Sequence, residues 1–312
     1  MTALVEAAPG AARALLLNGD SVIEAHLRRN DVALPFGLVA PARLIRRDAG
    51  HAVVQIAGEE ALLSPRPADW HEGQTRLAQV VREARSDGAR DKQARVVAHA
   101  GPAQAPPALA DSFEQPTLVT PFGADRLGEA NWDAVVEEAV TGVVDFPGGR
   151  LLMAPTPGML VIDVDGPGDP GRLAEAAAIA VAAAIRRHGI TGPVVVDFPS
   201  LGGRAARAIV DALLATHLPN PFEKTAMNGF GLVQIIRPRG RLSLLEEARR
   251  PGFAALELLR RAMRLTGAVT ISGPPSVHDW LGARPALVAE LARITGGRVA
   301  VERGEMPHVQ QG

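Results

Sequence analysis

Three aspartates at the ends of apolar segments are the residues of this sequence best suited to chemistry. Asp163 and Asp165 close the segment MLVIDVDG, and Asp197 closes PVVVDF. Glycine or proline follows each segment, which predicts that the chain turns there. In open α/β sheets, ligands gather outside the carboxyl ends of the strands. The three carboxylates are therefore the first candidates for a functional site.

The chemistry that such carboxylates favour is the binding of a divalent cation. A carboxylate beside several buried aliphatic side chains is costly to ionise unless a cation or hydrogen-bond donors compensate. Two carboxylates from neighbouring strands suit one hard cation, magnesium or manganese, which can acidify a bound water and neutralise charge on a phosphodiester oxygen. The alternative is that these aspartates cap the following helices or contact solvent, and the residues alone leave both interpretations open.

Strands and helices are predicted to alternate around these aspartates. Helices are expected at residues 132–142, 171–188 and 203–218, and strands at 150–156, 159–166, 192–198 and 229–240. This alternation is typical of an α/β domain whose strands are buried on both faces, and we place that domain at residues 131–248. A further run of helix, strand, helix and strand at 249–312 predicts a small C-terminal αβαβ domain.

The N-terminal third has a different pattern. Short stretches alternate apolar and polar residues, with turn signals such as Asn18 followed by Gly19. Short strands joined by tight turns are typical of a small β-barrel or sandwich, which we place at residues 1–98. Residues 99–130 begin with a stretch rich in proline and alanine and are interpreted as a linker.

Composition excludes several classes of site and protein. The chain has no cysteine, so disulfides and thiolate zinc sites are excluded. The N-terminus lacks a basic region before an apolar stretch, and the longest apolar run is too short and too rich in alanine to span a bilayer. We therefore expect a cytoplasmic protein with no membrane partner. The net charge of −1 gives no global attraction to nucleic acid, so any RNA contact must depend on local charge.

Arginines provide that local charge. Arg237, Arg239 and Arg241 alternate with other residues, so in a strand they would share one face, and we expect them next to the acidic strand ends. The planar guanidinium donates two hydrogen bonds to a phosphate at once. Arg204 opens a predicted helix after the loop SLGG, where free backbone amides favour a phosphate. These four arginines are the predicted RNA contacts of this region.

The segment FPGGRLLMAPTPGMLVIDVDG resembles part of the ribonuclease E/G family, in which a Gly-Gly turn leads into two strands ending in a catalytic aspartate. Thr156, Ile162 and Asp163 match the family pattern, whereas Asp165 stands where the family has asparagine. Further matches are the segment GPVVVDF, which carries Asp197, and the segment FGLVQIIRPRGRLSLLE. The resemblance is specific from about residue 132 to 246.

The resemblance implies a DNase-I-like or RNase-H-like catalytic domain that cleaves single-stranded RNA internally, in RNA processing or decay. It also implies Mg²⁺, or Mn²⁺ in its place, on Asp163 and Asp197, with a metal-bound water attacking the phosphodiester. Asp165, in place of the family's asparagine, would still bind or orient the metal, but it adds negative charge near the substrate phosphate. The alternative function is a catalytically weakened RNA-binding or scaffold protein of the same fold.

The N-terminal block resembles the family's OB-fold RNA-binding domain, which implies RNA contact by Lys92. Val53 and Leu63 occupy the positions of the family's RNA-facing aromatic residues, so base stacking by this barrel should be weak. A docking or stabilising barrel is the alternative. The family's 5′-end sensor and RNase-H-like region have no room before the catalytic domain, and its zinc-binding cysteine pair is missing. The last αβαβ unit resembles the family's small domain, which implies homodimer contacts there.

Overall fold

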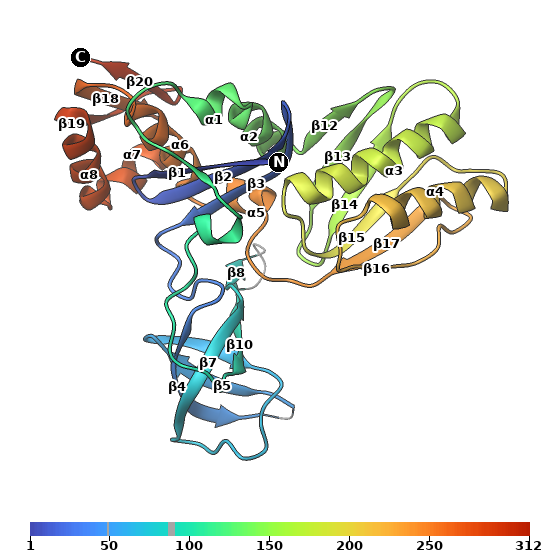
Figure 1. Ribbon diagram of the computed structural model, residues 1–312, viewed down its shortest axis with the longest axis horizontal. Coiled ribbons are helices and arrows are strands. Elements are labelled where there is room, and N and C mark those ends of the chain that lie inside the picture. The colour runs from blue at the N-terminus through green and yellow to red at the C-terminus, as the bar shows by residue number, and fades with distance from the viewer. Residues whose placement is uncertain (49, 87–90) are drawn as a thin grey trace.

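The computed structural model describes residues 1–48, 50–86 and 91–312. It is a mixed α/β structure with a closed five-stranded barrel and several sheets, so the predicted combination of a barrel with α/β elements is confirmed at this level. In Figure 1 the barrel lies below the other elements, and the chain enters and leaves it through two extended segments. Within the described residues, no helix is long and apolar enough to cross a bilayer.

The barrel is formed by five strands within residues 39–98. These are β4 (Val39–Arg47), β5 (Ala52–Ile56), β6 (Glu59–Leu63), β7 (Thr75–Arg82) and β10 (Ala94–Ala98). It closes because β10 pairs with β6 on one side and with β7 on the other. Alternate strand side chains such as Leu44 and Ile56 fill its interior, together with Trp70 from the segment before β7, and all three are at most 1% exposed. The short strands β8 (Arg85–Ser86) and β9 (Asp91–Lys92) pair in a separate two-stranded antiparallel sheet.

The first three strands lie outside the barrel, so the predicted unit 1–98 contributes to two different sheets. The strands β1 (Thr2–Ala8), β2 (Ala11–Asn18) and β3 (Ser21–Arg29) form a sheet with β11 (Thr117–Val119), and Asn18 pairs with Ser21 across the predicted turn. Leu4 and Leu15 share one hydrophobic core with Trp132 and Leu256. Alternation marks a strand but does not say which sheet it joins, which is why the predicted boundary differs.

The predicted linker 99–130 is held against the structure at several points. Gln104 bridges to Val39 at the mouth of the barrel, and β11 pairs in parallel with β1. The segment also contains a 3₁₀ turn at Ala110–Ser112 and the short helix α1 (Arg126–Glu129), whose N-cap Asp125 accepts a hydrogen bond from the Gly128 amide. The segment is therefore part of the packed structure, because its strand residues supply the partner that the edge of β1 needs.

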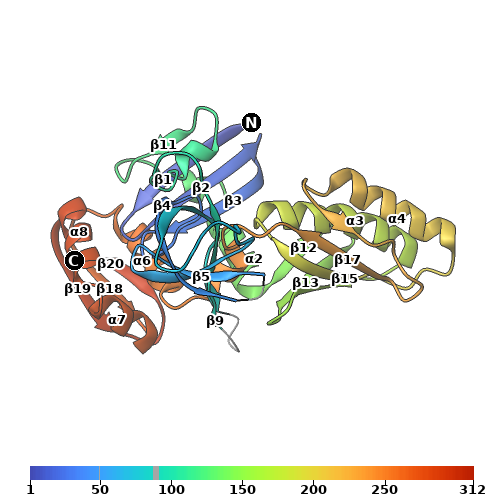
Figure 2. The ribbon, with the colours of Figure 1, turned by 90° about the horizontal axis from the view of Figure 1, so that it is seen from below.

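The central sheet has six strands in the order β12-β13-β14-β15-β17-β16. They are β12 (Val143–Phe146), β13 (Gly149–Pro155), β14 (Leu160–Asp165), β15 (Gly192–Asp197), β17 (Leu232–Arg237) and β16 (Glu223–Lys224). The helices α3 (Pro170–Arg187) and α4 (Arg204–His217) cover one face only, as Figures 1 and 2 show. The prediction that both faces are buried is therefore wrong, and residues of β14 alternate between buried and exposed.

The C-terminal part contains the predicted αβαβ pattern with two additions. It consists of α6 (Phe253–Ala262), β18 (Gly267–Gly273), α7 (Pro275–Gly282), α8 (Pro285–Thr295), β19 (Gly296–Arg303) and β20 (His308–Gln311). Helix α7 and strand β20 were not predicted. Two short elements connect the parts: α2 (Trp132–Thr141) precedes the central sheet, and α5 (Leu244–Ala248) follows it behind a capping box made by Ser243 and Glu246.

A buried ionic cluster joins the N-terminal sheet to α6. Arg13 is fully buried and donates to Glu257 through Nε (3.0 Å) and Nη2 (2.9 Å), while the Trp132 indole donates to the same carboxylate at 2.9 Å. Arg260 contacts Glu6 at 3.1 Å and Asp125 at 2.6 Å. A buried ion pair gains little over an apolar pair, but loss of one member leaves an uncompensated charge. The cluster therefore makes the stability of the N-terminal sheet and that of α6 depend on each other.

The first prediction tests this cluster. Arg13→Met should lower the free energy of unfolding by about 3–5 kcal/mol, because Glu257 would remain buried without its cationic partner. Arg261→Ala is the control: Arg261 is half-exposed on the same helix as Glu257 and lies 3.4 Å from Asp133, so its removal should cost less than about 1 kcal/mol. Urea unfolding measures both values, and equal losses would contradict the prediction.

Candidate active site

Asp163 and Asp197 are paired across two neighbouring parallel strands. β14 and β15 run in parallel because the helix α3 connects them as a crossover, and the register places Asp163 directly beside Asp197. Neighbouring strands lie about 4.8 Å apart and paired residues point to the same face. Both side chains are exposed, whereas Ile162 and Val196 before them are buried. The two carboxylates therefore share the face of the sheet that the helices leave uncovered.

Asp165 extends this acidic edge by one step along β14. It is exposed like Asp163, two residues before it, and its partner on β13 is Arg150. The Arg150 guanidinium also lies 3.4 Å from Asp145 on β12. Asp165 is thus aligned with a cationic residue across the strand pair, whereas Asp163 and Asp197 are aligned with each other.

The positive ends of two helices lie at the same end of the sheet. Helix α3 begins shortly after Asp165, and its N-cap Asp169 accepts a hydrogen bond from the Arg172 amide at 2.9 Å. Helix α4 begins with the exposed Arg204, and its N-cap Gly203 offers no side-chain acceptor, so the first amides of α4 are not capped by a side chain. Helix N-termini carry partial positive charge and attract anions. This end of the sheet therefore combines carboxylates with an exposed arginine and uncapped backbone amides, and phosphate binding by Arg204 stays a prediction.

The donor set fits an open magnesium site. Magnesium in proteins is held by one or two carboxylates and keeps several waters or substrate phosphate oxygens. Asp163 and Asp197 supply two carboxylates at the distance of neighbouring strands. Across the part of the chain that the structure describes, no group of three or more histidines or acidic residues could hold a metal. The pair could thus hold a magnesium ion with open positions but could not enclose it.

Phe230 is an exposed aromatic residue, two positions before the strand partner of Asp197, that the sequence analysis does not single out. Its side chain is 81% exposed in the turn before β17, whose first residue Leu232 pairs with Asp197. The turn is held by Asn228, whose Oδ1 accepts from the amides of Phe230 (2.9 Å) and Leu232 (3.0 Å). The predicted strand at residues 229–240 includes Phe230, so the turn is a difference from the prediction. The signal was the sequence Asn-Gly-Phe-Gly, which is typical of a turn.

Arg237, Arg239 and Arg241 do not lie next to the acidic strand ends, so that prediction is wrong. β17 runs antiparallel to β15, and Arg237 pairs with Gly192 at the start of β15, whereas Asp197 is at its end. Five residues of strand separate the two positions by about 17 Å. The sequence shows that the arginines follow an apolar strand, but the direction of that strand depends on its connection.

Lys92, in β9, contacts the turn between two strands of the central sheet. Its Nζ donates to the Pro157 carbonyl at 3.2 Å, in the turn between β13 and β14. Val53 and Leu63, at the positions expected to face RNA, are 4% and 0% exposed. They are therefore packed inside the protein and offer no stacking surface.

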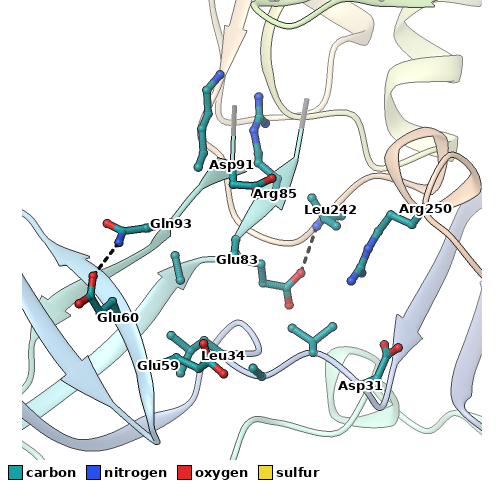
Figure 3. A pocket seen from close by; sticks show the side chains of 15 residues that line it. Asp31, Leu34, Glu59, Glu60, Glu83, Arg85, Asp91, Gln93, Leu242 and Arg250 are labelled. Atoms are coloured by element: carbon teal, nitrogen blue, oxygen red, sulfur yellow. Dashed lines mark hydrogen bonds between the residues drawn. The ribbon is translucent and has the colours of Figure 1, made fainter. Parts of the chain in front are cut away.

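A cavity of about 450 Å³ lies at the junction of the barrel with the rest of the chain (Figure 3). Glu83 spans it: one carboxylate oxygen accepts from the Phe36 amide at 3.0 Å and the other from the Leu242 amide at 3.4 Å. Arg250 lines the same cavity and contacts Glu247 of α5 at 2.9 Å. Burial raises the pKa of Glu247 to about 7, although Arg250 acts in the opposite direction.

The second prediction concerns the pH dependence of stability. Because the Glu247 pKa is raised from 4.5 to about 7 on folding, its stabilising contribution is complete below pH 4.5 and is lost as the pH rises through 7. The free energy of unfolding should fall by about 2–3 kcal/mol more between pH 5 and 8 in the wild type than in Glu247→Gln. Urea unfolding at both pH values measures this. Glu59→Gln, at an exposed position, should keep the wild-type slope, and an unchanged slope in Glu247→Gln would contradict the prediction.

Comparison with known proteins leaves this site to be interpreted from its own residues. No protein-family model matches the sequence, and no curated protein matches it either. What the geometry establishes is an exposed pair of aspartates on parallel strands, a third aspartate beside them, and two helix N-termini at the same edge.

Proposed function

We propose that the protein is a metal-dependent endoribonuclease that cleaves single-stranded RNA, with Asp163 and Asp197 holding Mg²⁺ or Mn²⁺. The observation that carries the proposal is the pairing of these two aspartates in register on parallel strands, with both side chains exposed. Two exposed carboxylates side by side can each offer oxygen ligands to one hard divalent cation. An exposed edge of this kind also admits a long polymer, which a closed pocket would exclude.

The resemblance of residues 132–246 to the ribonuclease E/G family supports the same activity. On this proposal the six-stranded sheet with α3 and α4 is the DNase-I-like or RNase-H-like catalytic domain, and the five-stranded barrel is an OB-fold-like domain. The protein would be a short form without the 5′-end sensor and without the zinc link. RNA would be its partner in the cytoplasm, and the C-terminal part would form a homodimer contact.

Each residue of the edge has a role in this proposal. Asp163 and Asp197 ligate the cation, and Asp165 orients it or its waters. A magnesium ion bound there would neutralise charge on the phosphodiester and acidify a bound water. Arg204 and the first amides of α4 bind the neighbouring phosphate. Phe230 provides a face on which a base stacks.

A second candidate is an RNA-binding or scaffold protein of the same fold with weak chemistry. Asp165 favours it, because a third carboxylate beside the pair adds negative charge where the substrate phosphate must approach. Tight RNA binding without any product that depends on magnesium would identify this function.

The third prediction tests the carboxylate pair. Asp163→Asn and Asp197→Asn should each lower magnesium-dependent cleavage of labelled single-stranded RNA by at least about a hundredfold, which corresponds to about 2.7 kcal/mol of transition-state stabilisation. Neither change should alter the unfolding midpoint greatly, since both side chains are exposed. Asp20→Asn, in the exposed turn between β2 and β3, is the control and should cleave normally. Undiminished cleavage by both site variants would contradict the proposal.

The fourth prediction concerns Phe230. Phe230→Ala should weaken the binding of a short single-stranded RNA by about 1–3 kcal/mol, the contribution of one stacked base. Phe122→Ala is the matched control, because Phe122 is also highly exposed (71%) but follows β11, away from the aspartates. Fluorescence anisotropy in EDTA measures binding without cleavage. Equal affinities for Phe230→Ala and the wild type would exclude this role.

A further inference from the structure

A second cavity, of about 780 Å³, lies at the end of the central sheet opposite the aspartates. Five arginines line it: Arg28 from β3, Arg186 from α3, Arg237 at the end of β17, and Arg239 and Arg241 directly after β17. We call this cavity the basic pocket. Its arginines come from three parts of the sequence, which is why the sequence alone shows only one side of it.

The charge of the basic pocket is poorly balanced. Among its described lining residues the only carboxylate is that of Glu24, which pairs with Arg186 (3.0 Å) and His26 (3.1 Å). The nearest acidic partner recorded for Arg239 is Glu246, outside the lining and 3.7 Å away. Five guanidinium groups thus face one carboxylate. Clustered cations of this kind are stable when an anion lies between them.

Neutral groups hold three of the guanidiniums in place, and the first of them, Arg28, donates to the Pro107 carbonyl. Arg237 donates to the carbonyls of Ile190 (2.6 Å) and Pro219 (3.2 Å), and Arg241 donates to the Ser112 hydroxyl at 3.3 Å. These bonds fix the arginine forks without neutralising them, so most of their N–H donors stay available. Burial lowers the pKa of Arg241 and the charge of Arg28 lowers it further, whereas Glu83 acts in the opposite direction.

One further residue of the wall suits a nucleotide. Phe36 lies under the Arg241 guanidinium, with 5.6 Å between the guanidinium carbon and the ring centroid, and adds an aromatic side to the basic pocket. His188 also lines the wall, but it is fully buried and bonds Glu138 through Nε2 at 2.9 Å, so its role is to hold the wall in place.

A purely structural role explains only part of this arrangement. Arg237 bridges two backbone segments and needs no ligand. Arg186, Arg239 and Arg241 make few such contacts, and their convergence on one cavity brings like charges together. We propose that the basic pocket binds the phosphate groups of a nucleotide, either free or within an RNA strand. Its volume lies in the range of small-ligand sites, and arginine forks match phosphate oxygens. The proposal does not depend on cleavage at the aspartates.

Binding of ADP and of inorganic pyrophosphate to the full-length protein tests the proposal. Isothermal titration calorimetry in EDTA keeps any metal at the aspartates from contributing. Arg241→Gln and Arg186→Gln should each weaken both ligands about tenfold or more, because each removes charged hydrogen bonds to phosphate. The Arg186 side chain is 40% exposed, so this variant should fold even if Arg241→Gln does not. Arg293→Gln, at an exposed arginine of α8, is the control and should bind as the wild type.

A parallel measurement with a labelled oligocytidylate separates the two sources of the nucleotide. Weaker RNA binding in both pocket variants, with displacement of the RNA by ADP, would assign the pocket to nucleotides within RNA. Binding of ADP with unchanged RNA affinity would assign it to free nucleotides. No binding of ADP or pyrophosphate, or equal weakening by Arg293→Gln, would overturn the proposal, and neither result bears on cleavage by Asp163 and Asp197.

Discussion

The parallel pairing of β14 with β15 is the constraint on which the arrangement of the charged groups depends. A crossover through α3 is needed to return the chain to the same edge, and it places Asp163 beside Asp197. The next strand in the sheet, β17, is antiparallel, so its C-terminal arginines are carried to the opposite end. Strand β15 thus has one parallel neighbour, β14, and one antiparallel neighbour, β17. The aspartates therefore lie at one end of the sheet and the arginines that follow β17 lie at the other.

The basic pocket also depends on how the N-terminal sheet is attached. Arg28 and Glu24 belong to β3, which packs against α3 and α5. The position of that sheet is set in turn by the shared hydrophobic core and by the buried contacts of Arg13 and Arg260 with acidic residues. Burying full charges costs desolvation that only well-formed partners offset, so such contacts select one arrangement over others. The same attachment leaves the barrel outside this core, with an interior of its own.

Local pattern predicted most elements around the candidate site and failed where distant strands had to be assigned. The aspartates at the ends of two strands and the helices after them follow from periodicity and turn residues. Periodicity does not show that β1–β3 form a sheet outside the barrel or that β17 runs antiparallel to β15. Both features depend on pairing between distant segments. Phe230 was missed for a local reason: an aromatic residue beside apolar ones looks like strand, while the hydrogen bonds of Asn228 make the segment a turn.

The separation of the two charged regions has an electrostatic consequence. At physiological ionic strength the Debye length is about 8 Å, and the strand between Gly192 and Asp197 spans about 17 Å. The arginines therefore do little to offset the repulsion between the exposed carboxylates, and the carboxylates do little to balance the arginines. The net charge of −1 is therefore the sum of regions with opposite local charge, which include the negative strand ends and the positive basic pocket. On the proposals made above, a cation at the strand ends and an anion in the basic pocket would each balance one of them.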